Sequence, residues 1–181
     1  MQQELNRRTF VKTGLVAAST LATAQTWAKT VGPNDKVRMG FIGIGNRGTQ
    51  LLRLFMEQPD VEVAALCDIY DPFLQRDNSR IDPAWLQRLG PRLPDMTEKF
   101  AKPPKRYTDY RRLLDDPEID AVCIATPDHW HAIQSIAAMH AGKDVYCEKP
   151  LTITIAEGRR MVQVQQETNR IAAVGLNRRG N

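Results

Sequence analysis

A glycine-rich turn between two apolar runs constrains the fold of this chain more than any other feature. The turn is Gly43-Ile44-Gly45-Asn46-Arg47-Gly48, and it follows the apolar run Val37–Ile42. An amphipathic run, 49–57, comes next, and Asp68 follows a second apolar run, Val61–Leu66. This order predicts a strand, a tight turn, a helix, a second strand and an acidic group, which is the pattern of a dinucleotide-binding βαβ unit. A glycine turn of another α/β protein, such as a methyltransferase, is the alternative.

Each part of this unit has a physical role in holding a dinucleotide. The first glycine allows the sharp turn, the second lets a diphosphate approach the backbone, and the third lets the helix lie close to the sheet. The N–H groups and the dipole of the helix's first turn favour negative charge. We therefore expect the cofactor to contact the residues of the turn, Gly43, Ile44, Gly45, Asn46, Arg47 and Gly48.

The acid after the second strand bears on the choice between NAD and NADP. The carboxylate of Asp68 can accept hydrogen bonds from the adenosine ribose hydroxyls and would repel a 2′-phosphate, so NAD is favoured. NADP stays open as an alternative, because arginines between Arg76 and Arg92 can fold back towards a phosphate.

The first 34 residues are expected to be a signal peptide and linker, leaving 35–181 as the globular domain. Arg7-Arg8-Thr9-Phe10-Val11-Lys12 precedes a weakly apolar stretch, 14–24, that is too short to span a bilayer as a helix. Paired arginines before such a stretch resemble a twin-arginine export signal, which predicts a periplasmic protein that folds around its cofactor before export. A disordered basic tail is the alternative.

Composition fits a soluble globular domain and argues against nucleic-acid binding. The chain is 42% hydrophobic and 25% charged, and most of its +4 net charge lies in the leader. The three cysteines are an odd number, which does not suit a disulfide framework, so we expect buried free thiols. His129 and His131 beside Asp128 are too few ligands to predict a metal site.

Strand-like and helix-like runs alternate through the rest of the chain. Short apolar runs separated by crossover helices predict a Rossmann-type α/β fold, a parallel sheet with helices on both faces, which binds ligands at the carboxyl ends of its strands. Beyond the first two strands we expect strands at 106–107, 121–125, 145–147 and 172–174, helices at 47–58, 72–77, 110–114, 131–141 and 155–168, and a loop with one or two helical segments at 81–104.

The ends of the later strands carry the remaining candidate residues. Thr126, Pro127 and His131 come after one strand and suit the nicotinamide end of the cofactor. After the next strand come Glu148, which we expect to contact the cofactor, and Lys149, which we expect to be catalytic; both precede Pro150. Because proline restricts the residue before it, the lysine is aimed, and its ammonium can hydrogen-bond a substrate hydroxyl and stabilise the alkoxide of a hydride-transfer reaction. A solvated Lys–Glu pair is the alternative.

Several blocks of the chain resemble the nucleotide-binding half of the Gfo/Idh/MocA oxidoreductases. The matching blocks are 40–48, Asp68, 125–131, 141–150 with its Glu-Lys-Pro, and 175–179. The resemblance implies NAD(P)-dependent oxidation or reduction of a sugar, a polyol or a related small molecule. It also implies that Lys149 lies beside the reacting carbon and that Arg178 contacts the nicotinamide end. One departure is Asp128, where the family often has Asn.

Members of that family usually continue into a second α/β domain, which supplies an acid–base Asp and His and the dimer face. This chain ends at Asn181, so we expect the substrate domain to be missing, turnover to be weak or absent, and a homo-oligomer only in a full-length protein. Two rival functions are an NAD-dependent glycoside hydrolase of the same superfamily and a non-catalytic NAD-binding module. Such hydrolases tend to lack the lysine of Glu-Lys-Pro, so Lys149 favours the oxidoreductase.

Overall fold

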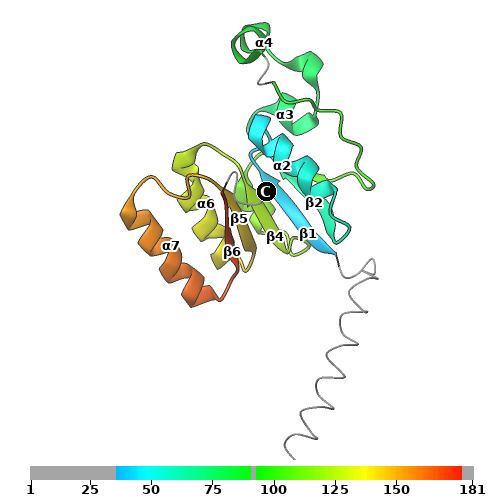
Figure 1. Cartoon of the computed structure of the whole chain (residues 1–181). Helices are drawn as coiled ribbons and strands as arrows, with labels where there is room; N and C mark the ends of the chain where they lie inside the picture. Colours follow the sequence, from blue (N-terminus) through cyan, green and yellow to red (C-terminus); the bar gives the residue numbers. More distant parts are fainter. Residues whose placement is uncertain (1–35, 91–92, 177–181) are drawn as a thin grey trace, which may run out of the picture. The chain divides into compact units, whose positions relative to one another are not determined.

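The chain folds around a parallel sheet of six strands (Figure 1). The structure, a computed structural model, describes residues 36–90 and 93–176, so the predicted leader at 1–34 and Arg178 lie outside it. The elements are β1 (Val37–Ile42), α2 (Asn46–Met56), β2 (Val61–Cys67), α3 (Asp71–Gln75), the short helix η1 (Asn78–Arg80), α4 (Pro83–Leu89), β3 (Lys105–Tyr107), α5 (Tyr110–Leu114), β4 (Ala121–Ile124), α6 (Asp128–His140), β5 (Asp144–Glu148), α7 (Ile155–Thr168) and β6 (Ala172–Gly175).

The strand order is β3-β2-β1-β4-β5-β6, and every neighbouring pair is parallel. The direction of strand addition reverses at β1, between β2 and β4, which is where sheets of this kind open a ligand crevice at their carboxyl ends. This arrangement confirms the predicted Rossmann-type α/β fold.

Side chains from the two faces of the sheet form two separate cores. Phe41, Leu66 and Cys123 pack with α2 residues such as Leu52 and with residues of the segment after β2. On the other face, strand residues pack against α5, α6 and α7, including Leu113, Met139 and Val164. Buried strands with covered faces explain why the strand sequences are continuous apolar runs rather than alternating ones.

The cysteines lie inside these cores as free thiols, as the odd number predicted. Burial raises the pKa of Cys67 to about 12 and that of Cys147 to about 11, because a thiolate would lose its hydration there. Burial raises the pKa of Cys123 as well. Such thiols are poor nucleophiles, so the structure gives them a packing role.

Most element boundaries match the sequence-based expectation, and α6 departs from it most. The helix begins at Asp128 rather than at His131, with Pro127 as its N-cap residue. The first three residues of the helix lie in the predicted loop, but Asp128 is an acid in the first turn, where the helix dipole favours it. The first turn of α6 therefore stands at the carboxyl ends of the strands.

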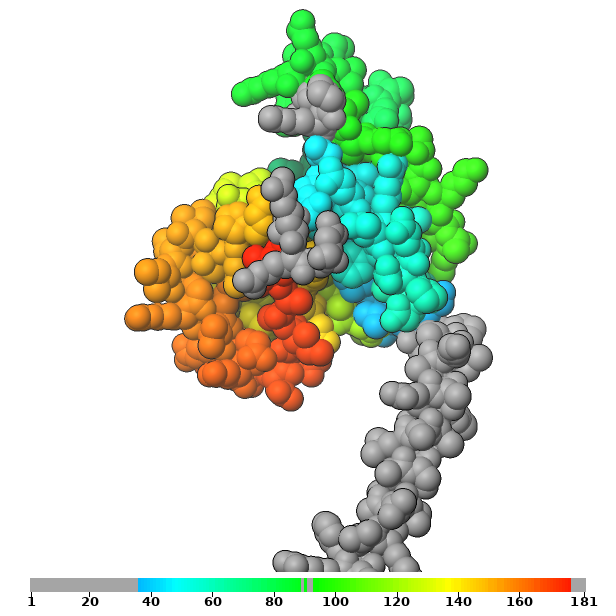
Figure 2. Space-filling model, viewed as in Figure 1, coloured from blue at the N-terminus to red at the C-terminus, as the bar shows by residue number. Residues whose placement is uncertain are grey.

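The segment between β2 and β3 contains three short helices and is fixed to the rest of the domain by ion pairs. The side chain of Glu98 is almost fully buried, and its Oε1 forms ion pairs with Arg76 Nη2 at 2.7 Å and Arg53 Nε at 3.2 Å. Arg53 also pairs with Asp95 at 3.0 Å. Figure 2 shows the green surface of this segment beside the cyan surface of α2. In residues 36–90 and 93–176 no helix has the length and apolarity that a membrane crossing requires.

Candidate dinucleotide-binding site

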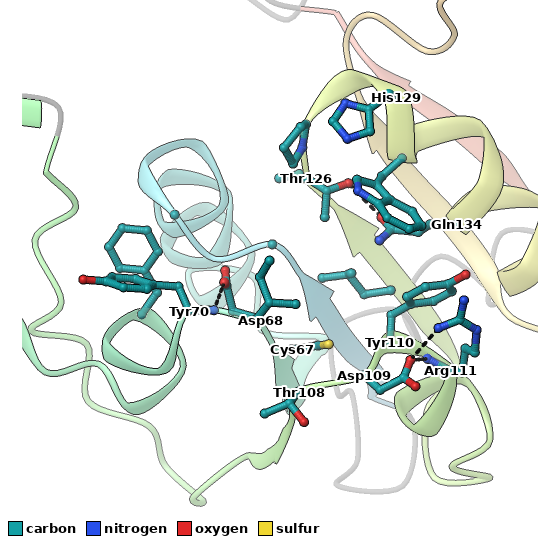
Figure 3. Close-up of a pocket in the computed structure, with 18 of the residues that line it drawn as sticks. Cys67, Asp68, Tyr70, Thr108, Asp109, Tyr110, Arg111, Thr126, His129 and Gln134 are labelled. Carbon is teal, nitrogen blue, oxygen red and sulfur yellow. Dashed lines mark hydrogen bonds and ion pairs between the residues drawn. The ribbon is translucent and has the colours of Figure 1, made fainter. Parts of the chain in front are cut away.

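A cavity of about 730 Å³ opens at the carboxyl ends of β1, β2, β3 and β4 (Figure 3). Its volume is in the range typical of small-molecule sites. Its lining residues come from the segments directly after these strands, and they are Ile42, Gly43, Gly45, Cys67, Asp68, Ile69, Tyr70, Phe73, Trp85, Thr108, Asp109, Tyr110, Arg111, Ala125, Thr126, Pro127, His129, Trp130 and Gln134. The sheet therefore brings together residues that lie far apart in the sequence.

The turn after β1 requires glycine at two of its positions. Gly43 has a φ of +81°, which side chains disfavour, and a Cβ there would lie 2.8 Å from the backbone nitrogen of Thr126. A Cβ on Gly48 would overlap the carbonyl oxygen of Gly43. Above Gly45, an added Cβ would meet only the ring of Phe73, at 3.5 Å. The turn is thus tight against the protein on one side and open towards the cavity.

The first turn of α2 faces this opening with backbone donors. Gly45 is the N-cap residue, no side chain caps the helix, and the first turn contains no acid. The side-chain oxygen of Thr49 donates to the Ile44 carbonyl at 3.0 Å, which fixes the turn against the helix. A helix N-terminus in this state favours an anion through its N–H groups and its dipole.

Asp68 is held in place by two backbone donors. Its Oδ2 accepts from the Ile44 N–H at 2.8 Å and its Oδ1 from the Tyr70 N–H at 2.9 Å. Burial raises the pKa of Asp68, while these N–H groups and the nearby Arg76 act to lower it. A carboxylate oxygen can accept more than one hydrogen bond, so each oxygen keeps acceptor capacity for a hydroxyl group in the cavity.

Two of the arginines that the sequence offers as phosphate ligands are engaged elsewhere, and Arg92 lies outside the described residues. Arg76 is only 6% exposed; besides Glu98, it donates to the carbonyl of Ile44 at 3.1 Å and to Thr49 Oγ1 at 3.0 Å. Arg80 pairs with Asp71 at 2.6 Å. A 2′-phosphate would therefore meet the Asp68 carboxylate while these two guanidinium groups are already paired.

Two pairs of aromatic side chains line the cavity, and of these four the sequence placed only Trp130 near the nicotinamide end. Near Asp68, the rings of Tyr70 and Trp85 are stacked, with centroids 5.4 Å apart and planes 16° from parallel. In the part of the cavity after β3 and β4, the rings of Tyr110 and Trp130 pack edge to face, with centroids 6.2 Å apart. Trp85 showed only helical spacing in the sequence, and its place beside Tyr70 depends on how the segment after β2 folds back.

The loop after β4 supplies Thr126 and Pro127 to the cavity, as expected of the strand ends. Thr126 Oγ1 donates to Gln134 Oε1 at 2.7 Å, which fixes the threonine side chain against α6. His131 is placed differently. It is 1% exposed and lies behind the lining, with Nε2 2.8 Å from the Thr126 carbonyl and Nδ1 2.6 Å from the Pro150 carbonyl.

The turn after β5 holds Lys149 beside an ion pair whose carboxylate is buried and whose arginine is partly exposed. Glu148 is 3% exposed, and its Oε1 accepts from Arg47 Nε at 2.7 Å. Its Oε2 accepts from the backbone N–H of Lys149 at 3.0 Å. Glu148 and Arg47 are separate cofactor contacts in the sequence-based prediction, whereas in the structure they pair with each other. Lys149 is exposed, and the Lys149–Pro150 peptide bond is cis.

These features fit a dinucleotide. The glycine turn leaves open space where a diphosphate would approach, the α2 N-terminus offers donors, and Asp68 is a fixed acceptor one strand away. In residues 36–90 and 93–176 there is no group of three or more His, Cys, Asp and Glu side chains that could hold a metal ion.

Comparison with known proteins agrees with this geometry. Residues 37–176 match the family "Oxidoreductase family, NAD-binding Rossmann fold", GFO_IDH_MocA. A glycosyl hydrolase family 109 protein of Stenotrophomonas maltophilia is 37% identical, over 91% of this chain and 34% of the relative. The inositol 2-dehydrogenase of Salmonella paratyphi B is 32% identical, over 79% of this chain and 38% of the relative.

Solved structures give the same result. The myo-inositol 2-dehydrogenase of Lactobacillus plantarum superposes with a TM-score of 0.61 and 28% identity, covering 81% of this chain and 38% of that one. An NAD-binding protein of Listeria innocua also superposes with a TM-score of 0.61 and 28% identity, and the match covers 80% of this chain and 36% of that protein. The chain therefore spans between a third and two fifths of the length of these relatives.

Proposed function

We propose a function from the premise that this chain belongs to the Gfo/Idh/MocA family and is an NAD-binding Rossmann domain of it. The chain is the cofactor-binding part of an enzyme that oxidises or reduces a hydroxyl-bearing carbon of a sugar, a polyol or a related small molecule by hydride transfer. The observation that carries the proposal is the alignment of the glycine turn, Asp68 and the Lys149 turn along one edge of the sheet.

The adenosine half of the cofactor would lie over β2. Its ribose hydroxyls would donate to Asp68, whose orientation two backbone N–H groups already fix. Its adenine would pack on the stacked rings of Tyr70 and Trp85, because aromatic faces stack favourably on bases. Its diphosphate would accept from the N-terminus of α2. NAD is favoured over NADP, because the Asp68 charge would repel a 2′-phosphate and Arg76 is already paired with Glu98 and Thr49.

When bound, NAD supplies the carbon that accepts or returns the hydride. The contribution of this chain to the chemistry lies at Lys149, which β5 places next to the β4 end of the cavity. Its ammonium group donates a hydrogen bond to the oxygen of the reacting carbon. In the reduction that oxygen gains negative charge as hydride arrives at the carbonyl carbon, and in the oxidation it gains the charge as its hydroxyl proton leaves, before hydride transfer. The hydrogen bond is therefore stronger to the oxygen in the transition state than to the neutral hydroxyl or carbonyl of the ground state, and the rate rises.

The lysine role can be tested in the longest natural reading frame that contains this sequence. Lys149→Met should lower kcat by about 100-fold to 1,000-fold, as loss of one oxyanion donor does, and leave the Kd for NAD within about threefold. Lys102→Met, on an exposed lysine that pairs with Glu62 at 3.6 Å, is the matched control and should leave both unchanged. An unchanged kcat in Lys149→Met would overturn the assignment.

A second candidate function has one observation in its favour. Relatives that cover about nine tenths of this chain carry the name glycosyl hydrolase family 109 protein, as in S. maltophilia and Shewanella pealeana. Such an enzyme would use bound NAD for a transient oxidation during glycoside cleavage. Chromogenic glycosides offered to the full-length protein discriminate: release of the aglycone without net NADH supports the hydrolase, and NADH formation from a free sugar or polyol supports the oxidoreductase.

We also propose that the leader directs export to the periplasm by the twin-arginine route. The paired arginines at 7 and 8 support this, together with the weakly apolar stretch after them. Replacing both arginines by lysine should retain the protein in the cytoplasm, whereas equal periplasmic recovery of both forms would refute the proposal. A homo-oligomer is proposed only for the full-length protein.

A further inference from the structure

His131 joins two segments that the sheet leaves side by side. Its ring lies between the loop after β4 and the turn after β5, and it is 1% exposed. Nε2 is 2.8 Å from the carbonyl oxygen of Thr126, and Nδ1 is 2.6 Å from the carbonyl oxygen of Pro150. Both distances are within the range of direct hydrogen bonds.

Both partners of the ring are carbonyl oxygens, which can only accept. Each bond therefore requires a proton on the ring nitrogen that faces the carbonyl. The neutral ring donates to one carbonyl at a time, and the doubly protonated ring donates to both. The doubly protonated ring therefore links the two loops, because its two nitrogens point in different directions from one rigid ring, while the neutral ring links α6 to the one loop whose carbonyl it donates to.

The two linked segments carry different parts of the site. Thr126 lines the cavity where the cofactor is expected, and Pro150 comes directly after Lys149. The other side of Lys149 is held independently, since its backbone N–H donates to Glu148, which in turn pairs with Arg47 of the glycine turn. The backbone around the lysine is thus anchored at both ends, once to the diphosphate turn and once to the β4 loop.

We propose that His131 is a positioning residue, which holds the Lys149–Pro150 turn at a fixed place relative to the cofactor-contacting loop at Thr126. This inference rests on the proposed role of Lys149. The ring lies behind the cavity lining, so it acts through the lysine rather than on the cofactor. A displacement of a reacting group by about 1 Å can cost on the order of 100-fold in rate, which is enough for a hidden anchor to matter.

The first test measures the backbone rather than catalysis. In the 181-residue chain, His131→Phe keeps a ring of similar size but removes both hydrogen bonds, and His131→Asn keeps a single short donor. Hydrogen–deuterium exchange of the amides at Lys149 and Leu151 should accelerate by about tenfold or more in both variants, because local opening becomes easier. Exchange in the middle of α7 should not change.

A matched control is available on the same helix. His140 is exposed at the end of α6, so His140→Phe makes the same chemical change without touching the two carbonyls. It should leave exchange at Lys149 as in the unmodified chain. Unchanged exchange at Lys149 in folded His131→Phe, or an equal acceleration in His140→Phe, would overturn the proposal.

The second test separates positioning from a general loss of structure. In the full-length enzyme, His131→Phe should lower kcat by about 10-fold to 100-fold while the Kd for NAD stays within about threefold. If His131→Asn does not fold, His131→Gln replaces it. Equal losses of NAD affinity and kcat would mean that His131 serves only the fold, which contradicts positioning. If Lys149→Met leaves turnover intact while His131→Phe still accelerates exchange, the proposed role of Lys149 fails and the anchor stands.

Discussion

The role of Asp68 gives the sharpest prediction for the 181-residue chain. Asp68→Ala removes the acceptor for the ribose hydroxyls, and a hydrogen bond to a charged group contributes about 1.5–3 kcal/mol, which corresponds to a 10-fold to 150-fold weaker Kd for NADH. The same change removes a negative charge from the position of a 2′-phosphate. Two unit charges about 4 Å apart repel by about 4 kcal/mol at an intermediate dielectric and by about 1 kcal/mol in water.

The partly exposed Asp68 lies between these limits, so its repulsion should raise the ratio of Kd for NADPH to Kd for NADH by about 5-fold to 700-fold in the unmodified chain, and the ratio should fall by the same factor in Asp68→Ala. Fluorescence titration with both reduced coenzymes measures the two constants. Asp68→Asn is a less clean variant, because two backbone N–H groups face the carboxylate and the amide has one oxygen to offer them.

The matched control for this experiment is Asp115→Ala. Asp115 forms an exposed surface pair with Arg112, and neither residue lines the cavity, so its loss should leave both constants unchanged. A melting curve must show that Asp68→Ala is folded, because two backbone donors lose their acceptor. A folded Asp68→Ala that keeps its preference for NADH would refute the reasoning about the ribose.

Further predictions concern the glycine turn, the stacked Tyr70 and Trp85, and the ion pair between Lys105 and Asp116. Gly48→Ala should abolish NADH binding, since its Cβ would overlap the Gly43 carbonyl; titration with near-normal affinity would contradict this. Trp85→Ala should raise the Kd for NADH about 5-fold to 100-fold, because the adenine loses its stacking partner, and should reduce energy transfer from tryptophan to NADH. An unchanged Kd would show that the adenine does not pack on Tyr70 and Trp85. Lys105 Nζ lies 2.8 Å from Asp116 Oδ2 and lowers the pKa of this carboxyl group to about 2, against 3.8 in a free chain. The stability that this pair contributes is therefore present above about pH 4 and is lost as the pH falls towards 2. Melting curves of Asp116→Asn should show a weaker loss of stability over that range, and identical acid profiles would contradict the role.

The sequence allowed the fold and the strand-end residues to be predicted because both depend on local patterns. A short apolar run with Gly43 at its end identifies β1 and its turn, and Asp68 is identified by its place after the next run. In a parallel sheet all carboxyl ends lie at one edge. Thr126 and Lys149 each come directly after a strand, so their placement at the same edge could be predicted without the structure.

Other features of the site depend on neighbours that are distant in the sequence, and they could not be predicted from it. Arg76 looked available for a phosphate, but it is buried against Glu98 from a segment with no regular pattern. Trp85 reaches the cavity only because that segment folds back over Tyr70. His131 was expected at the cofactor, yet a helix that begins earlier carries it behind the lining. Pairings of this kind depend on tertiary packing, which local sequence patterns do not encode.

A crystal structure of this chain grown with NADH tests the central claim most directly. We predict density for the dinucleotide across the carboxyl edge of the sheet, with the diphosphate oxygens on the backbone N–H groups at the start of α2 and the adenosine ribose on Asp68. A coenzyme bound elsewhere on the domain, or a well-ordered domain that takes up none at saturating concentration, would contradict the account.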